Sequence, residues 1–223
     1  MTLPAALISC TVLGLQHGID VDHVAAITDV TSIQRTPLDA TRCGLLYAIG
    51  HAATVGLLGV AVIVLKRSVP AQASLRMERV IGMTLALLGA YVLSALLTSG
   101  SSMSRGRAIL SLIHRIRRRP AAENATSGYG PKSSLGLGVL HGIGAETPTQ
   151  LSVLLIASNL GGIQNGILGL TVFAAGMFAS NMVLTTAATG VFSMSRGRPV
   201  IFRILATFTA ACSLWIGFRM MIG

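Results

Sequence analysis

The stretch Leu13–Asp29, LGLQHGIDVDHVAAITD, places ionisable side chains inside a segment that is otherwise apolar enough to form a membrane helix. Such groups are costly in the hydrocarbon core of a bilayer, and they usually mark the path of an ion or a proton. Imidazole and carboxylate together suit borderline divalent cations such as Ni(II), Co(II) and Zn(II). The stretch therefore predicts a metal site within a membrane-spanning segment, with four candidate ligands: His17, Asp20, Asp22 and His23.

The composition of the whole chain agrees with a membrane protein. Its 223 residues are 52% hydrophobic and only 11% charged, and the mean hydropathy is +0.72. Such a chain is expected to have the lipid bilayer as a partner rather than to fold as a soluble domain. The formal net charge of +10 comes from Lys and Arg residues between the apolar segments, which is typical of loops beside anionic lipid. We therefore expect no nucleic-acid partner.

Several segments reach the length of about 20 apolar residues that is needed to cross a bilayer. The fifth is long enough to be tilted, broken or split into two spans. Most Lys and Arg residues lie on the same side as the loop 99–134, which is therefore expected in the cytoplasm, with both termini outside. The predicted fold is all-α, a polytopic membrane protein of about six transmembrane helices. The expected spans are residues 4–29, 43–65, 79–98, 135–158, 163–193 and 201–222.

The two halves of the chain resemble each other in sequence. HGIDVDH at 17–23 aligns without a gap with HGIGAET at 141–147, and YAIG at 47–50 resembles FAAG at 173–176. Because each half has an odd number of spans, the second copy is expected to be inverted, which points to a substrate site near the bilayer midplane. Chance similarity between helices rich in Gly, Ala and Leu is the alternative. The predicted parts of this single membrane domain are a first three-span repeat at 1–98, a basic cytoplasmic loop at 99–134 and a second three-span repeat at 135–223.

Helical geometry groups the candidate ligands of the first half. On a continuous helix His17, Asp20 and His23 lie on one stripe, whereas Asp22 points elsewhere. A bend at Gly18 would let Asp22 join the site or orient a ligating histidine from outside. The alternative is a polar helix end at the membrane interface.

Two further places carry candidate ligands. In LGLGVLHGIGAETPTQ at 135–150, His141 and Glu146 are possible ligands or a proton-coupling pair, because glycines and a proline in an apolar span are tolerated where the backbone lines a cavity. The alternative is that the glycines only permit close helix packing. His51 is the ionisable residue deep in the second span, where a lone histidine is more often a packed core residue than a ligand.

These motifs resemble the nickel/cobalt permease (NiCoT) family of bacterial secondary transporters. The resemblance implies uptake of Ni(II) or Co(II) as substrate across the bacterial inner membrane, with no enzymatic activity and no resident cofactor. It also implies that His17, Asp22 and His23 select the ion while His51 assists. Where aspartates commonly follow FAAGM in that family, this chain has Ser180 and Asn181. The resemblance rests on His17 followed after four residues by Asp22 and His23, on IGHAATV around His51, on LGLGVLHGIGAETPTQ at 135–150 and on FAAGM at 173–177.

From these features we expect a hydrated dication to move by alternating access. It would be held by the two histidines at 17 and 23 and by Asp20 or Asp22, with help from His51, and would exchange towards Glu146 and His141. A nickel/cobalt exporter would share the same ligands. An intramembrane metalloenzyme would need an activated water and a general base, and the chain has no HExxH or GxSxG motif. The sequence carries no signal for an oligomeric state.

Overall fold

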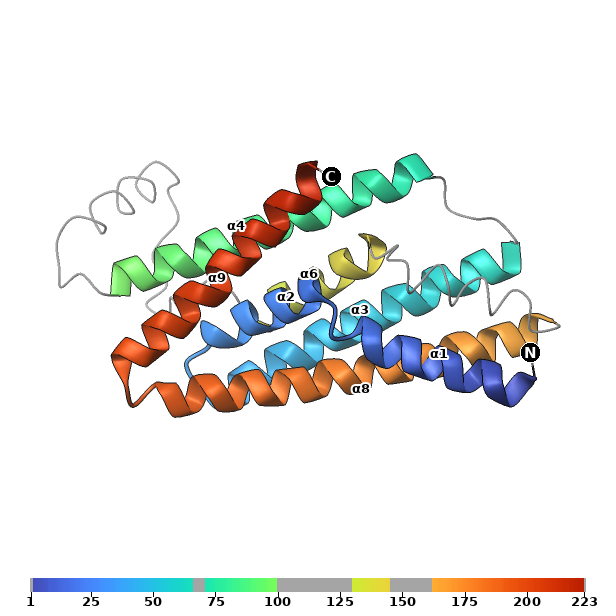
Figure 1. Cartoon of the computed structure of the whole chain (residues 1–223), viewed down its shortest axis with the longest axis horizontal. Coiled ribbons are helices and arrows are strands. Elements are labelled where there is room, and N and C mark those ends of the chain that lie inside the picture. Colours follow the sequence, from blue (N-terminus) through green and yellow to red (C-terminus); the bar gives the residue numbers. More distant parts are fainter. Residues whose placement is uncertain (1, 66–70, 100–129, 145–161, 223) are drawn as a thin grey trace.

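The computed structural model describes residues 2–65, 71–99, 130–144 and 162–222, and all regular structure in these ranges is helical (Figure 1). The all-α prediction is therefore confirmed. The helices are α1 (Leu3–His17), α2 (Val21–Ser32), α3 (Pro37–Leu65), α4 (Ala71–Ser99), α6 (Pro131–Gly144), α8 (Ile163–Ser195) and α9 (Pro199–Ile222).

Four of these helices are long and apolar enough to cross a membrane, so the chain is a multi-pass membrane protein. They correspond to the second, third, fifth and sixth expected spans. Helix α8 is one continuous helix of 33 residues, so the fifth span is not split. Of the fourth expected span, 135–158, the described residues include only the part within α6. The four spanning segments are Pro37–Leu65, Leu75–Leu97, Ile163–Ser195 and Pro199–Ile222.

The first expected span, 4–29, is not one helix, and this corrects the prediction of a continuous stripe of ligands. Helix α1 ends at His17 and α2 begins at Val21. Gly18 lies so close to α8 that a Cβ on it would be 2.1 Å from Oγ of Ser180 and 2.6 Å from the carbonyl oxygen of Met177. Asp20 then adopts an extended conformation at the N-cap of α2, where its side chain makes no hydrogen bond to the helix backbone and instead accepts one from His17. The break thus follows from a close approach to a helix more than a hundred residues away in the sequence.

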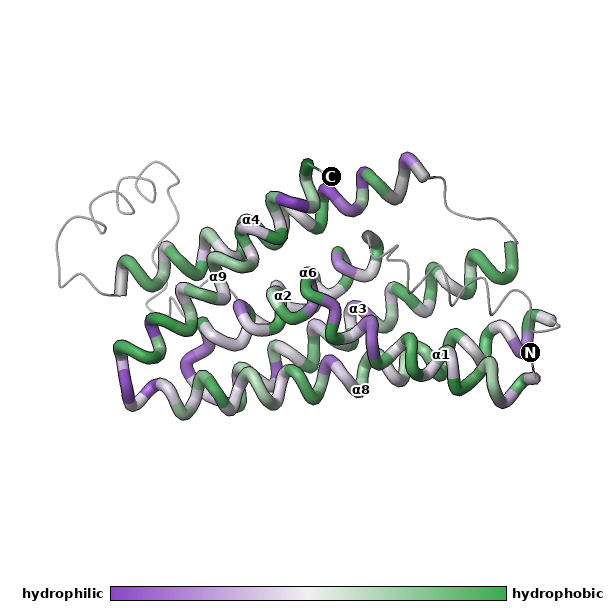
Figure 2. The backbone as a smooth tube through the Cα atoms, viewed as in Figure 1, coloured by the Kyte–Doolittle hydropathy of each residue, from purple (hydrophilic) through white to green (hydrophobic). Residues whose placement is uncertain are grey.

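The short helix α2 lies in the middle of the bundle. Helix α1 packs along α8, α6 packs along α3, and α4 packs along α9 (Figure 1). Helix α2 contacts α3, α4, α8 and α9. Figure 2 shows hydrophilic residues at the junction of α1 and α2, near the middle of the molecule and away from the ends of the long helices. The fold therefore places the polar stretch of the sequence inside the helical bundle.

Glycines bring two of these helix pairs into backbone contact. A Cβ on Gly14 of α1 would lie 2.1 Å from the carbonyl oxygen of Phe173 in α8, and a Cβ on Gly138 of α6 would lie 2.1 Å from the carbonyl oxygen of Tyr47 in α3. Small residues allow this close approach of helix backbones, which is a main source of packing between membrane helices.

Replacing Gly138 by Ala is expected to destabilise the α3–α6 contact. The added methyl group forces the backbones apart, which costs about 1–3 kcal/mol in a well-packed interior. The midpoint of thermal unfolding of the detergent-purified protein should fall. The matched control is Gly136→Ala in the same helix, where no atom lies within 4 Å of the added Cβ. Equal midpoints for the two variants would contradict the packing described here.

Candidate metal centre

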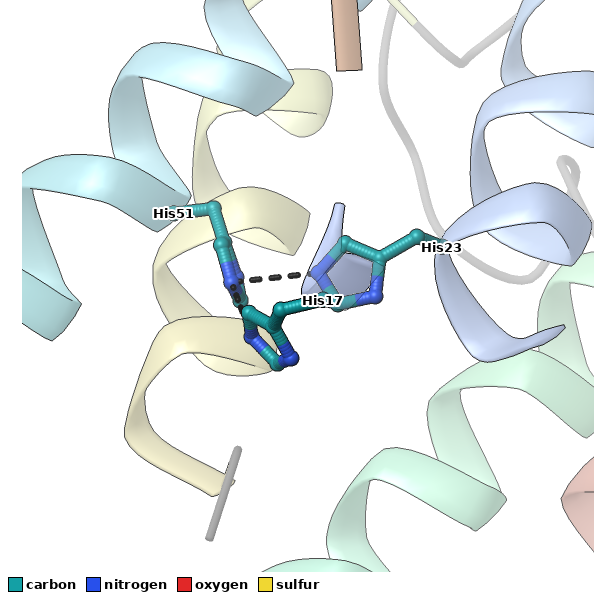
Figure 3. Close-up of side chains that lie close together, drawn as sticks. All are labelled: His17, His23 and His51. Atoms are coloured by element: carbon teal, nitrogen blue, oxygen red, sulfur yellow. Dashed lines mark hydrogen bonds between the residues drawn. The ribbon is translucent and has the colours of Figure 1, made fainter. Parts of the chain in front are cut away.

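Three buried histidine side chains converge where α1, α2 and α3 meet. His17 ends α1, His23 lies in the first turn of α2, and His51 lies midway along α3. Figure 3 shows their imidazole rings directed towards one another. Nε2 of His51 is 3.1 Å from Nε2 of His23 and 3.4 Å from Nε2 of His17. All three residues are 0% exposed, so the cluster is shielded from bulk solvent.

These separations suit three nitrogens bound to one metal ion. With metal–nitrogen distances of about 2.0–2.1 Å, two imidazole nitrogens on one ion are about 3.0 Å apart at a right angle and about 3.4 Å apart at a tetrahedral angle. The distances of 3.1 and 3.4 Å fall within this range. One ligand atom from each histidine lies within 4.8 Å of the other two. Two of the three nitrogen pairs are therefore already at the spacing of ligands on one ion, and the pair from His17 and His23 lies within 4.8 Å.

The two aspartates of the stretch each hold one of these histidines. Oδ2 of Asp20 accepts a hydrogen bond from Nδ1 of His17 at 3.1 Å, and Oδ1 of Asp22 accepts one from Nδ1 of His23, also at 3.1 Å. Because an ionised carboxylate can only accept, this network assigns the proton to Nδ1 of each ring. The lone pair of each Nε2 then faces the centre. This carboxylate–imidazole arrangement is the one that commonly orients histidine ligands of metals.

His51 is held differently from the other two histidines. Its Nδ1 is buried and has no hydrogen-bond partner among the described residues. Without an ion, His51 can donate its Nε2 proton to the lone pair on Nε2 of His23. To bind an ion through Nε2 it has to carry the proton on Nδ1 instead. Loading the site therefore requires a change of tautomer at His51 alone.

Aromatic rings and a fourth histidine surround the cluster. The ring of Phe173 stacks on His17 with centroids 5.6 Å apart, and Tyr47 stacks on His51 at 6.1 Å. The ring of His141 lies 6.4 Å from that of His23. Nδ1 of His141 donates to the carbonyl oxygen of Leu137, and its Nε2 has no partner within the part of the chain that the structure describes. His141 thus presents a lone pair beside the cluster without belonging to it.

The structure therefore brings together six of the seven residues that the sequence singled out. Three form the cluster, two aspartates orient it, and His141 lies next to it. The seventh, Glu146, lies outside the described residues.

Sequence reasoning gave no role to Asn181. This residue is fully buried in α8, and neither atom of its carboxamide has a hydrogen-bond partner in the described ranges. Its Oδ1 would be 3.3 Å from a Cβ on Gly18, so it lies against the break between α1 and α2. In the sequence, the feature that could have drawn attention to this residue is its carboxamide side chain in the middle of a predicted membrane span.

The chain is similar in sequence to one family profile and to two known proteins. The family profile described as "Cytochrome C biogenesis protein transmembrane region" matches residues 23–215. The chain is 25% identical over 211 residues to a protein of Bacillus sp. (strain TB-90) named urease accessory protein UreH, covering 94% of this chain and 87% of that protein. It is 39% identical over 64 residues to a protein of Cryptococcus neoformans var. grubii named high-affinity nickel transport protein, covering 28% of this chain and 13% of that protein. No solved structure matches the chain significantly.

Replacing Asp22 by Asn is expected to weaken metal binding without removing it. The amide still reaches His23 but no longer fixes the proton on Nδ1, and loss of such a partner typically lowers metal affinity by about 10–100-fold. Titration of the purified protein with Co(II), followed by the visible absorption of the bound ion, measures this change. The matched control is Asp39→Asn, at an acid that bonds to Thr36 away from the cluster. Unchanged affinity in the Asp22 variant would contradict the orienting role.

Proposed function

This chain belongs to the cytochrome C biogenesis protein transmembrane region family, and we propose that it transports a divalent transition-metal ion, Ni(II) or Co(II), across the membrane. The observation that carries the proposal is the convergence of the Nε2 atoms of His17, His23 and His51 inside a bundle of membrane-spanning helices. The name of the Cryptococcus relative, high-affinity nickel transport protein, supports nickel as the ion. The NiCoT-like motifs of the sequence support the same class of substrate.

The donor set favours a borderline dication. Three imidazoles without a thiolate suit Ni(II), Co(II) or Zn(II) better than Cu(I), and a site without carboxylate ligands suits Mg²⁺ or Ca²⁺ poorly. Because the imidazoles must be neutral to bind, protons compete with the ion, and binding weakens at acidic pH.

The break between α1 and α2 supports transport rather than a purely structural metal site. Discontinuous helices line the substrate sites of many secondary transporters, because their ends can shift as the protein opens to either side. An enzyme would need a general base for an activated water. Asp20 and Asp22, the acids at the described cluster, are both engaged with histidines.

We infer that the two halves are inverted repeats and that the ion passes between them. The sequence separation between Gly14 and Gly138 equals that between His17 and His141. Both glycines also make the same close contact with a backbone carbonyl of a long helix. This equivalence of the two halves supports His141, the counterpart of His17, as the next ligand after the cluster. Glu146, the counterpart of Asp22, is proposed to act with it. In this scheme the ion is handed from the first half to the second during alternating access.

We propose uptake across the bacterial inner membrane as the physiological direction. The central loop contains a single histidine, His114, whereas a histidine-rich cytoplasmic loop would indicate export. An exporter would use the same ligands, so vesicle flux with a metal gradient imposed in either direction distinguishes the two.

Replacing His17 by Ala is expected to abolish transport. The variant removes one of three convergent nitrogens and leaves the Asp20 carboxylate without its partner. Uptake of Ni(II) and Co(II) into proteoliposomes containing a metal-sensitive dye should fall to the level of protein-free liposomes. The matched control is Gln16→Ala, at the exposed neighbouring position, which should transport normally. Normal uptake by the His17 variant, or no uptake of either metal by the unmodified chain, would refute the proposed function.

A further inference from the structure

Asp29 is a buried acid that the metal centre does not use. It lies in α2 about 9 Å along the helix from His23, at a rise of about 1.5 Å per residue. It is 0% exposed, and neither of its carboxyl oxygens has a hydrogen-bond partner among the described residues. The nearby acids differ from it: Asp20 and Asp22 each accept a hydrogen bond from a histidine.

The surroundings of Asp29 suit a neutral acid rather than a carboxylate. Its carboxyl group faces the hydroxyl groups of Thr209 and Ser213 in α9. Both hydroxyl groups are near the carboxyl group, but neither meets the distance and angle of a hydrogen bond to it. Both hydroxyl groups donate their protons within α9, Thr209 to the carbonyl oxygen of Ala206 and Ser213 to that of Thr209. Towards Asp29 they therefore present oxygen lone pairs. These lone pairs can accept a hydrogen bond from a protonated carboxyl without any change. To bind an ionised carboxylate, each hydroxyl has to turn its proton away from its carbonyl partner in α9.

Among the residues that the structure describes, no cationic side chain pairs with a negative charge at this position. Within the described ranges Asp29 makes no ion pair, and α8, one of the helices packed against α2, has no titratable side chain. An isolated ionised carboxylate in such a place is strongly disfavoured. The titratable groups on α2 itself and on the other helices packed against it, none of which pairs with Asp29, are Asp22, His23, Asp39, Arg42, Cys43, Tyr47, His51, Arg76, Glu78, Arg79, Tyr91, Arg203, Cys212 and Arg219.

We propose that Asp29 is a proton-binding site whose occupancy controls the docking of α2 on α9. In the conformation described here its carboxyl is protonated, and its O–H group is directed at a hydroxyl oxygen of Thr209 or Ser213. When the proton leaves to a water molecule, the charged carboxylate needs new donors. Either Thr209 and Ser213 give up their hydrogen bonds within α9, or α2 separates from α9 at this point and admits water. In each case the contact between the two helices changes.

The position of α2 links this proton site to the metal centre, and this step rests on the proposed function. Helix α2 has 12 residues and is preceded by the break at 18–20, so it can move as a rigid body. It carries His23 at one end and Asp29 two turns further on. Because the three histidines converge while Asp29 is in its protonated contact, the proton and the ion favour the same conformation. The linkage predicts that a proton and a metal ion cross the membrane together.

Asp29→Asn tests this linkage, because the amide is neutral at every pH and can donate to the same hydroxyl oxygens. In proteoliposomes, an inward proton gradient should accelerate metal uptake by the unmodified chain several-fold. It should give no acceleration with the Asp29 variant, while exchange of metal for metal at equal pH stays at the normal rate. The matched control, Asp39→Asn, should keep the full acceleration. Acceleration retained in the Asp29 variant, or acceleration by a sodium gradient in place of the proton gradient, would overturn the proposal.

Infrared spectroscopy tests the protonated acid without any metal. The unmodified chain and the Asp39 variant in lipid at neutral pH should show the carbonyl stretch of a protonated carboxylic acid, which should be missing from Asp29→Asn. Should that variant fail to fold, Ser213→Ala should shift the same band, because it removes a hydrogen-bond acceptor. Absence of the band from the unmodified chain would refute the proton site even if metal transport is observed, and its presence without transport would refute only the proposed function.

Discussion

Two hydrogen bonds from imidazole Nδ1 atoms to carboxylates hold the centre of this protein in shape. Asp20 fixes the ring of His17 and Asp22 fixes that of His23, so the lone pairs of both Nε2 atoms face His51. Each bond is short-range in sequence, but both depend on the break between α1 and α2. A continuous helix would carry Asp22 away from the side shared by the histidines. The three-nitrogen cluster therefore depends on both hydrogen bonds, and both hydrogen bonds depend on the break between α1 and α2.

The sequence stretch LGLQHGIDVDHVAAITD was sufficient to predict buried polar chemistry in a membrane helix, because the cost of ionisable groups in lipid depends only on local composition. A bend at Gly18 was one of two possibilities that the sequence left open, and local reasoning could not decide that the helix breaks there. The break depends on the approach of Ser180 and Met177, and a contact between residues so far apart leaves no periodic signal. The residues alone could not place His51 with the other two histidines, since a lone histidine in an apolar span is normally a core residue. Its help at the site was expected from the family resemblance.

Polar groups of the interior extend beyond the three-histidine cluster. Among the described residues, Nε2 of His141 has no hydrogen-bond partner beside the cluster, and the carboxamide of Asn181 has none against the break. Such groups are unfavourable in a static membrane protein, because nothing compensates their lost hydration. In the proposed transport scheme, polar atoms of this kind are available to a passing ion. Within the described part of the chain Asp29 faces the hydroxyl groups of Thr209 and Ser213, and this environment suits a proton better than a metal ion.

X-ray absorption by Ni(II) bound to the purified protein tests the central claim most directly, because it counts the imidazole nitrogens around the ion. Three imidazole nitrogens at about 2.0–2.1 Å are expected for the unmodified chain, and two after His51→Ala. A bound ion surrounded only by oxygen atoms, or a spectrum that the His51 variant leaves unchanged, would show that the three histidines do not form the binding site.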